Sequence, residues 1–227
     1  MTRHIPNLLT LCNLAAGIVG IVAVFHDQPT FGSLMIWLGA GFDFLDGMAA
    51  RLLKKTSVIG KDLDSLADLI TFCFLPGSII YQMIEANQPG SIWSYTGFLL
   101  VIFGALRLAK FNNDTRQEDN FYGLPVPASA ICVSAFSFFP ESSPGEFTYF
   151  LTQNVALIAL AIILSALMVS DIKMLSLKFK NLQFQTNLSR YILLLVSVSL
   201  LVFFHISALP VIILFYVALS VVVNNFG

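Results

Sequence analysis

Apolar stretches long enough to cross a membrane recur along the chain and constrain its fold more than any other feature. A transmembrane helix needs about 20 mostly apolar residues. Stretches of this kind are predicted at residues 6–26, 31–51, 60–84, 92–110, 124–140, 148–170, 188–204 and 208–224. Only 11% of the 227 residues are charged, whereas a soluble domain carries about 25%. We therefore expect an all-α, polytopic transmembrane bundle of eight helices, forming one membrane-embedded domain over residues 1–227.

The basic residues predict how this bundle is oriented. All 12 Lys and Arg fall at one set of helix ends and loops, and the opposite loops carry acidic residues such as Asp27 and Glu141. Because Lys and Arg concentrate in cytoplasmic loops, we expect both termini and the basic end to face the cytoplasm, in a multi-pass protein of the cell (inner or plasma) membrane. The first apolar run lacks a small-residue cleavage site before Asp27, which favours a retained helix over a signal peptide.

Four aspartates form the strongest candidate site. Asp43 and Asp46 are three residues apart, and Asp64 and Asp68 are four apart, so each pair shares one helix face. A loop from Leu52 to Ile59 lets the two helices run antiparallel and turns the pairs toward each other. Carboxylates that converge in apolar surroundings cannot all stay charged without cations. Mg²⁺ and Mn²⁺ prefer oxygen ligands, so the spacing predicts a two-metal site.

A structural ion network is the alternative interpretation of these carboxylates. Its cations are Arg51, Lys54, Lys55 and Lys61. Such a network explains one or two carboxylates, but not four in two helical pairs. A carboxylate inside a membrane helix costs roughly 2.5–3.5 kcal/mol on insertion scales, and such residues are rarely without function. Asp62 lies on a different helix face from Asp64 and is left out of the predicted site.

The residues around the aspartates predict phosphate and nucleotide contacts. Gly47 and Gly60 are positions where a nucleotide can come near the backbone. Arg51 lies one and a half turns beyond Asp46 and can hold a phosphate with a fork of donors.

The whole pattern resembles the signature of a known enzyme family. It runs Asp43-x2-Asp46-Gly47-x2-Ala50-Arg51-x8-Gly60-x3-Asp64-x3-Asp68, and every specified position matches the CDP-alcohol phosphotransferase (class-I CDP-alcohol phosphatidyltransferase) family. The resemblance implies a polytopic enzyme that moves a phosphoalcohol from a CDP-linked donor to an alcohol and releases CMP. The family core usually has six helices, so about residues 1–187 correspond to the core and about 188–227 to an added helix pair. A homodimer is also implied.

The resemblance implies roles for individual residues. Asp43, Asp46 and Asp64 would ligate the two cations, Mg²⁺ or Mn²⁺, while Asp68 would complete the second metal site and act as the general base. The segment from Pro6 to Thr10 resembles the family's opening segment, although Pro and Asn are also common at a plain helix start. The expected contacts to the CDP-diacylglycerol donor are Asn7, Thr10, Gly47, Arg51, Ser57 and Gly60.

Three further segments resemble the phosphatidylserine synthase branch of the family. They are Gly104–Asn112, Phe121–Ala128 and Met168–Ser170 with Ser176–Lys178. Arg107 and Lys110 stand one turn apart and can receive the carboxylate of L-serine. Lys110 replaces a more usual Arg and offers a single-point contact. Both residues could instead be snorkelling anchors at the membrane surface.

The predicted reaction is therefore transfer of the phosphatidyl group of CDP-diacylglycerol to the hydroxyl of L-serine, giving phosphatidylserine and CMP. Glycerol 3-phosphate or inositol phosphate as acceptor, and an archaeal-type lipid donor, remain open. A cation transporter is the alternative from another class. Transporters place ion sites near the midplane of repeated halves, whereas these carboxylates gather toward one face and no internal repeat is evident.

Overall fold

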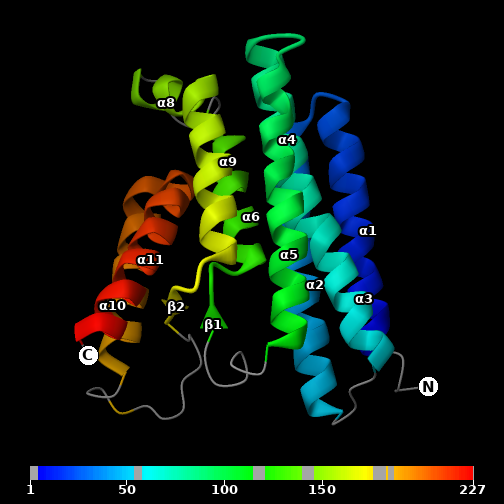
Figure 1. Cartoon of the computed structure of the whole chain (residues 1–227), viewed down its shortest axis with the longest axis vertical. Helices are drawn as coiled ribbons and strands as arrows, with labels where there is room; N and C mark the ends of the chain where they lie inside the picture. Colours follow the sequence, from blue (N-terminus) through cyan, green and yellow to red (C-terminus); the bar gives the residue numbers. More distant parts are fainter. Residues whose placement is uncertain are drawn as a thin grey trace.

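The protein folds as one bundle of helices that run side by side along its long axis (Figure 1). The computed structural model describes residues 5–53, 58–114, 121–139, 146–175, 183 and 187–226. The α-helices are α1 (Ile5–Phe25), α2 (Pro29–Leu52), α3 (Val58–Leu69), α4 (Leu75–Asn87), α5 (Leu99–Asn113), α6 (Val126–Phe136), α8 (Glu146–Leu151), α9 (Asn154–Val169), α10 (Leu188–Phe204) and α11 (Leu209–Phe226). The expected all-α bundle is confirmed.

Shorter elements join these helices. A π-helical turn, η2 (Ile70–Phe74), connects α3 directly to α4, and the 3-10 helix η3 (Ile92–Phe98) leads into α5. A second 3-10 turn, η6 (His205–Ala208), separates α10 from α11. One small antiparallel ribbon pairs β1 (Phe121–Tyr122) with β2 (Lys173–Met174). This ribbon was not expected from the apolar pattern.

Four helical stretches are long and apolar enough to cross a membrane: Ile5–Phe25, Ile59–Asn87, Ile92–Asn113 and Leu188–Asn224. The last stretch reverses at His205, whose φ of 51° breaks the helix into the pair α10 and α11. α6 and α9 are shorter apolar helices.

The stretch predicted as one helix at 148–170 is broken between α8 and α9. The Thr152 hydroxyl donates to the backbone carbonyl of Tyr149 (3.1 Å), a local bond that competes with helix continuation.

Small residues let the first helices pack closely around the candidate site. α1 packs along α2 and against α3 and η2. At the crossing of α2 with η2, a Cβ on Gly39 would run into the side chains of Thr71 and Asn13. A Cβ on Gly17 would likewise run into Thr71. Any larger residue at these positions would push the helices apart. The close packing therefore fixes the helices that carry the aspartates.

The two ends of the bundle differ in charge. α1 begins and α11 ends at the same end, which also holds β1, β2 and the ends of α2, α3 and α5 that carry Arg51, Lys61 and Lys110 (Figure 1). α8 and the connection from α4 to η3 lie at the opposite end, near Glu85. Arg3, Lys54, Lys55, Arg116, Lys178 and Lys180 lie outside the described residues. We call the first of these ends the basic end.

Candidate active site

Three of the four aspartates converge between α2 and α3. Asp43, Asp64 and Asp68 each offer a carboxylate oxygen, and these oxygens lie within 4.8 Å of one another. Asp64 and Asp68 share one face of α3 because they are four residues apart. α2 and α3 are joined through residues 54–57, which lie outside the described residues. The arrangement gathers negative charge at a single point near the basic end.

The fourth aspartate is held by α1. Asp46 is buried, with 7% of its surface exposed, and is not among the three carboxylates that lie within 4.8 Å. The Thr10 hydroxyl, which is also buried, donates to Asp46 Oδ2 (2.7 Å). Asp46 nevertheless lies within electrostatic range of Asp43 and Asp64. Thr10 therefore contacts the acidic cluster through Asp46.

Asn13 is a site residue that the sequence interpretation missed. Its amide Nδ2 donates to Asp68 Oδ1 (3.3 Å), and its backbone carbonyl accepts from the Thr71 hydroxyl (2.9 Å). The side chain of Asn13 is fully buried. Spacing could have identified it, because Asn7, Thr10 and Asn13 recur every three residues and share one face of α1.

The chemistry of these groups fits hard divalent cations. Asp64 Oδ1 and Asn13 Oδ1 are buried oxygens without a hydrogen-bond partner, and buried polar atoms are normally satisfied. Three neighbouring carboxylates also repel one another unless protons or cations intervene. Oxygen-only ligands suit Mg²⁺, Mn²⁺ or Ca²⁺. Lys61, which the ion-network interpretation pairs with an aspartate, instead donates to the carbonyl of Asn112 (2.9 Å).

The residues expected to contact the donor differ in their exposure. A Cβ on Gly47 would meet nothing within 4 Å, so space is open beside Asp46. Asn7 and Gly60 are half-buried, and Arg51 is exposed in the last turn of α2. Ser57 lies outside the described residues. Asp62 is exposed and lies outside the group of three carboxylates.

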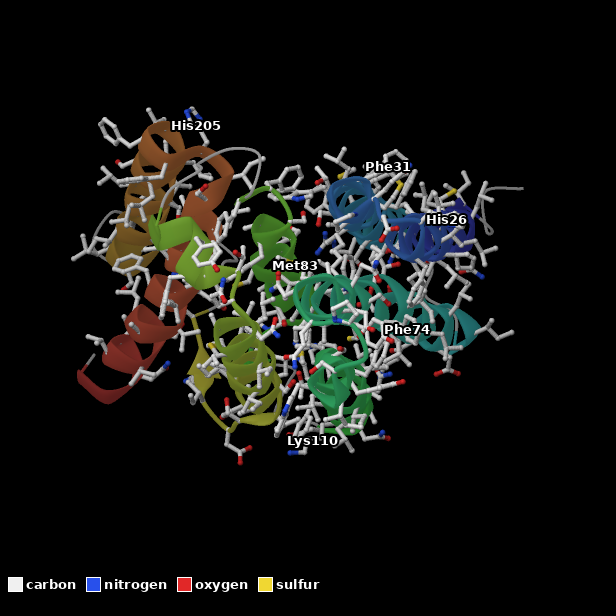
Figure 2. The ribbon with its side chains drawn as sticks, turned by 90° about the horizontal axis from the view of Figure 1, so that it is seen from above. His26, Phe31, Phe74, Met83, Lys110 and His205 are labelled. Atoms are coloured by element: carbon white, nitrogen blue, oxygen red, sulfur yellow. The ribbon has the colours of Figure 1, made fainter. Side chains whose placement is uncertain are left out.

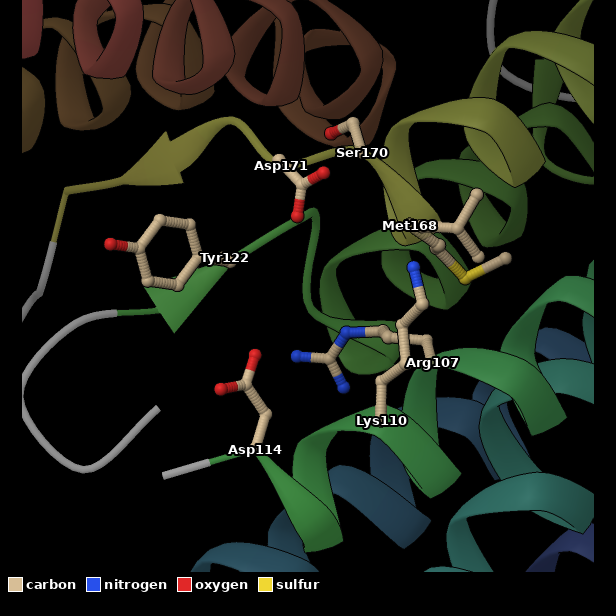
Figure 3. A pocket seen from close by; sticks show the side chains of 8 residues that line it. Arg107, Lys110, Asp114, Tyr122, Met168, Ser170 and Asp171 are labelled. Carbon is tan, nitrogen blue, oxygen red and sulfur yellow. The ribbon is translucent and has the colours of Figure 1, made fainter. Parts of the chain in front are cut away.

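A pocket of about 120 Å³ opens at the end of α5 (Figure 3). It contains both residues expected to bind the acceptor, Arg107 and Lys110. The pocket is lined by Arg107, Lys110, Asp114, Tyr122, Met168, Val169, Ser170 and Asp171. Arg107 is only 7% exposed, its guanidinium lies over the Phe111 ring (5.6 Å), and its Nε has no hydrogen-bond partner. We call this cavity the Arg107 pocket.

Close packing of α5 on η2 brings the Arg107 pocket near the aspartates. A Cβ on Gly104 would run into Cys73, which lies five residues after Asp68. Arg107 follows Gly104 by nearly one turn and lies within electrostatic range of Asp68. The acidic cluster and the Arg107 pocket therefore lie near each other.

Comparison with known proteins gives the class of this protein. Residues 3–170 match the family model described as CDP-alcohol phosphatidyltransferase, and the chain belongs to this family. The long apolar helices and the family together make it an integral membrane protein. Enzymes of the family generally depend on divalent metals, and the buried aspartate cluster fits that dependence.

Individual relatives narrow the comparison. The chain is 34% identical to the CDP-diacylglycerol–serine O-phosphatidyltransferase of Bacillus subtilis (strain 168), over 75% of this chain and 89% of that protein. It is 34% identical to the protein of the same name from Helicobacter pylori (strain 26695), over 91% of this chain and 84% of that protein. It is also 34% identical to an archaetidylserine synthase of Methanothermobacter thermautotrophicus, over 58% of this chain and 57% of that protein.

Proposed function

We propose that this protein transfers the phosphatidyl group of CDP-diacylglycerol to L-serine and releases CMP. One observation carries the proposal. Asp43, Asp64 and Asp68 converge, and Asp68 lies within electrostatic range of Arg107, in a chain of the CDP-alcohol phosphatidyltransferase family. An acidic cluster suits metal-assisted handling of a pyrophosphate, and a pocket lined by both basic and acidic side chains suits an acceptor that carries both charges. Relatives that act on serine support the same acceptor.

On the donor side, four aspartates hold two divalent cations, Mg²⁺ or Mn²⁺. Their ligands are Asp43, Asp46, Asp64 and Asp68. When bound, the cations neutralise negative charge on the pyrophosphate and on the departing CMP. The Thr10 hydroxyl orients Asp46 through its hydrogen bond. The CDP moiety lies against Gly47, where space is open, and its other contacts are Asn7, Thr10, Arg51, Ser57 and Gly60.

In the transfer step, the serine hydroxyl oxygen forms a bond to the phosphorus of the phosphatidyl group. The bond from that phosphorus to the oxygen of CMP breaks, and CMP departs with the bonding electrons. Asp68 accepts the hydroxyl proton as general base, because an alcohol is a weak nucleophile until its proton is removed. Asn13 donates to Asp68 Oδ1 and so orients this carboxylate.

On the acceptor side, the Arg107 pocket holds serine by both of its charged groups. Arg107 and Lys110 face the serine carboxylate, and Asp114 and Asp171 face its ammonium group. A phosphate-bearing acceptor, such as glycerol 3-phosphate or inositol phosphate, would instead bring a dianion close to two carboxylates. The mixed charge of the pocket therefore favours a zwitterionic acceptor.

The basic end faces the cytoplasm in this proposal. Water-soluble serine then reaches the Arg107 pocket while the acyl chains of the donor stay in the membrane. The protein acts as a homodimer, as expected for the family.

The test is an acceptor panel with purified protein in detergent. CMP release is measured with CDP-diacylglycerol, Mg²⁺ or Mn²⁺, and L-serine, glycerol 3-phosphate or inositol phosphate. The D68N variant and a sample treated with a metal chelator are measured alongside. We expect release that requires serine and metal and is lost in D68N. Release with another acceptor would overturn the serine assignment but keep the chemistry. No release with any acceptor, from folded protein, would reject the transferase proposal.

A further inference from the structure

The last helix, α11, binds the backbone of the small ribbon through three polar side chains. Tyr216 Oη donates to the carbonyl of Leu175 (3.0 Å), and the Leu175 amide donates to Ser220 Oγ (3.0 Å). Asn224 Nδ2 donates to the carbonyl of Lys173 (2.6 Å). The three side chains are four residues apart, so they form one stripe on α11. We call Tyr216, Ser220 and Asn224 the polar stripe.

The polar stripe is unusual because it lies on a strongly apolar helix. Ser220 is fully buried and Tyr216 is 8% exposed. Polar side chains within membrane helices are costly unless they find partners. Here their partners are backbone groups in and just after β2, rather than groups of a neighbouring helix. α11 therefore holds a segment that has no helical hydrogen bonds of its own.

The held segment forms a wall of the Arg107 pocket. β2 pairs with β1 in antiparallel register, with Tyr122 opposite Lys173, and the Gly123 amide donates to the carbonyl of Ile172 (2.9 Å). Tyr122 from β1 lines the pocket, as do Ser170 and Asp171 from the turn just before β2 (Figure 3). Contacts therefore run from α11 through β2 to the side chains that face Arg107.

The ribbon needs this support because it is short. Each strand has two residues, and an isolated pair of strands is marginally stable in water even when it is longer. Without the polar stripe, the backbone groups of Lys173 and Leu175 would lose their partners, and the positions of Tyr122 and Asp171 would fluctuate. A binding site whose walls are not held in place binds its ligand less well.

We propose that α11 is a positioning element for the acceptor pocket, and that Tyr216, Ser220 and Asn224 are positioning residues for acceptor binding. The family match ends at residue 170, so the helix pair adds a support that lies beyond the matched core. α11 packs on α6, α10 and β2, away from the first helices, which carry the acidic cluster. This role rests on the proposed function, because the pocket matters only if an acceptor enters it.

The test compares substrate constants in variants of the polar stripe. Y216F removes only a hydroxyl, and S220A removes the partner of the Leu175 amide. S199A is the matched control, because it makes the same change on an exposed face of α10. We expect the double variant Y216F/S220A to raise the KM for serine on the order of tenfold. Its KM for CDP-diacylglycerol and its metal requirement should stay within twofold of those of the original protein. Y216F alone should raise the KM for serine by a smaller factor.

Hydrogen exchange gives a second readout that does not depend on activity. Amides of residues 121–124 and 172–175 should exchange faster in Y216F/S220A than in S199A. Faster exchange with an unchanged serine KM would overturn the positioning role, and unchanged exchange would overturn the support itself. Equal increases in both KM values would indicate a general structural defect and also reject the proposal.

Failure of the proposed function can be told apart from failure of the positioning role. The unmodified protein would then release CMP in a way that does not depend on serine. The KM comparison is then made with whichever acceptor the panel identifies. If no acceptor supports release, the positioning role for acceptor binding is rejected together with the transferase, whatever the exchange rates show.

Discussion

At the scale of single residues, Thr10 connects α1 to the acidic cluster. Its hydroxyl donates to Asp46 Oδ2 (2.7 Å), and both side chains are buried. Partners that orient metal-binding side chains typically change metal affinity or activity by about 10- to 100-fold when removed. The hydrogen bond therefore gives Thr10 a measurable role even if it never touches a metal.

We predict that Thr10→Val raises the metal concentration needed for half-maximal CMP release by about 10- to 100-fold. Valine keeps the shape of threonine but cannot donate to Asp46. The measurement is a Mg²⁺ or Mn²⁺ titration at saturating CDP-diacylglycerol and serine. Thr96→Val is the control, because Thr96 Oγ1 donates only locally, to the carbonyl of Trp93 (2.6 Å). Identical metal curves for both variants would contradict the role assigned to Thr10.

Arg107 is a second residue whose substitution should affect one substrate more than the other. It is buried at the base of its pocket, and its Nε has no partner. A hydrogen bond to a charged group contributes about 1.5–3 kcal/mol. We therefore predict that Arg107→Ala raises the KM for serine by roughly 10- to 100-fold and changes the KM for CDP-diacylglycerol much less. Steady-state kinetics with each substrate varied in turn provide the measurement, and Lys61→Ala is a control outside the pocket. Equal losses on both substrates would rule out a serine pocket at Arg107.

At the scale of whole elements, glycines of α2 serve two different purposes. Gly39 faces inward, where a Cβ would run into Thr71 and Asn13, so it allows α2 to pack against η2 and α1. Gly47 lies two turns further on and faces open space. The same residue type therefore permits helix packing at one position and leaves room for a ligand at the other.

We predict opposite outcomes when each glycine is replaced by alanine. Gly39→Ala should lower the free energy of unfolding by about 1–3 kcal/mol, the usual cost of overpacking. It should also reduce activity, because Asn13 is displaced from Asp68. Gly47→Ala should raise the free energy of unfolding slightly, because alanine favours a helix more than glycine does, and it should raise the KM for CDP-diacylglycerol, because a methyl group then occupies the donor space. Unfolding in detergent and donor titration measure the two effects. A destabilised Gly47→Ala with unchanged donor KM would contradict this division.

The helices could be predicted from the sequence, but some residues of the candidate site could not. The helices and the pairing of aspartates along them follow from periodicity, because residues three or four apart share a face. Tyr122 and Asp171 in the Arg107 pocket did not follow, because they are brought beside Arg107 by a ribbon of four residues joining distant parts of the chain. Such pairings leave no periodic trace. Asn13 was missed for a different reason, since its spacing from Thr10 was visible but its partner Asp68 lies 55 residues away.

At the scale of the whole molecule, the bundle has one basic end and one end without described Lys or Arg residues. Viewed from above, α10 and α11 stand together on one side, and α1 and α2 stand on the other (Figure 2). Two acidic residues lie at the non-basic end: Asp27 just after α1, and Glu85 in the last turn of α4. Gln82 Nε2 donates to Asp27 Oδ1 there (2.5 Å). Basic residues concentrate on the cytoplasmic side of membrane proteins, so this asymmetry predicts which end faces the cell interior.

Cysteine labelling measures that orientation directly. Cys73 and Cys132 are buried, whereas Cys12 is partly exposed and is first replaced by alanine. Single cysteines are then introduced at Asp62, exposed at the basic end, and at Gln88, exposed at the other end. A membrane-impermeant maleimide should label Gln88→Cys in intact spheroplasts, and it should label Asp62→Cys only after the membrane is opened. The reverse pattern would place the aspartates and the Arg107 pocket outside the cell. Serine from the cytoplasm could not then reach the site, and the proposed supply of both substrates from one side would be wrong.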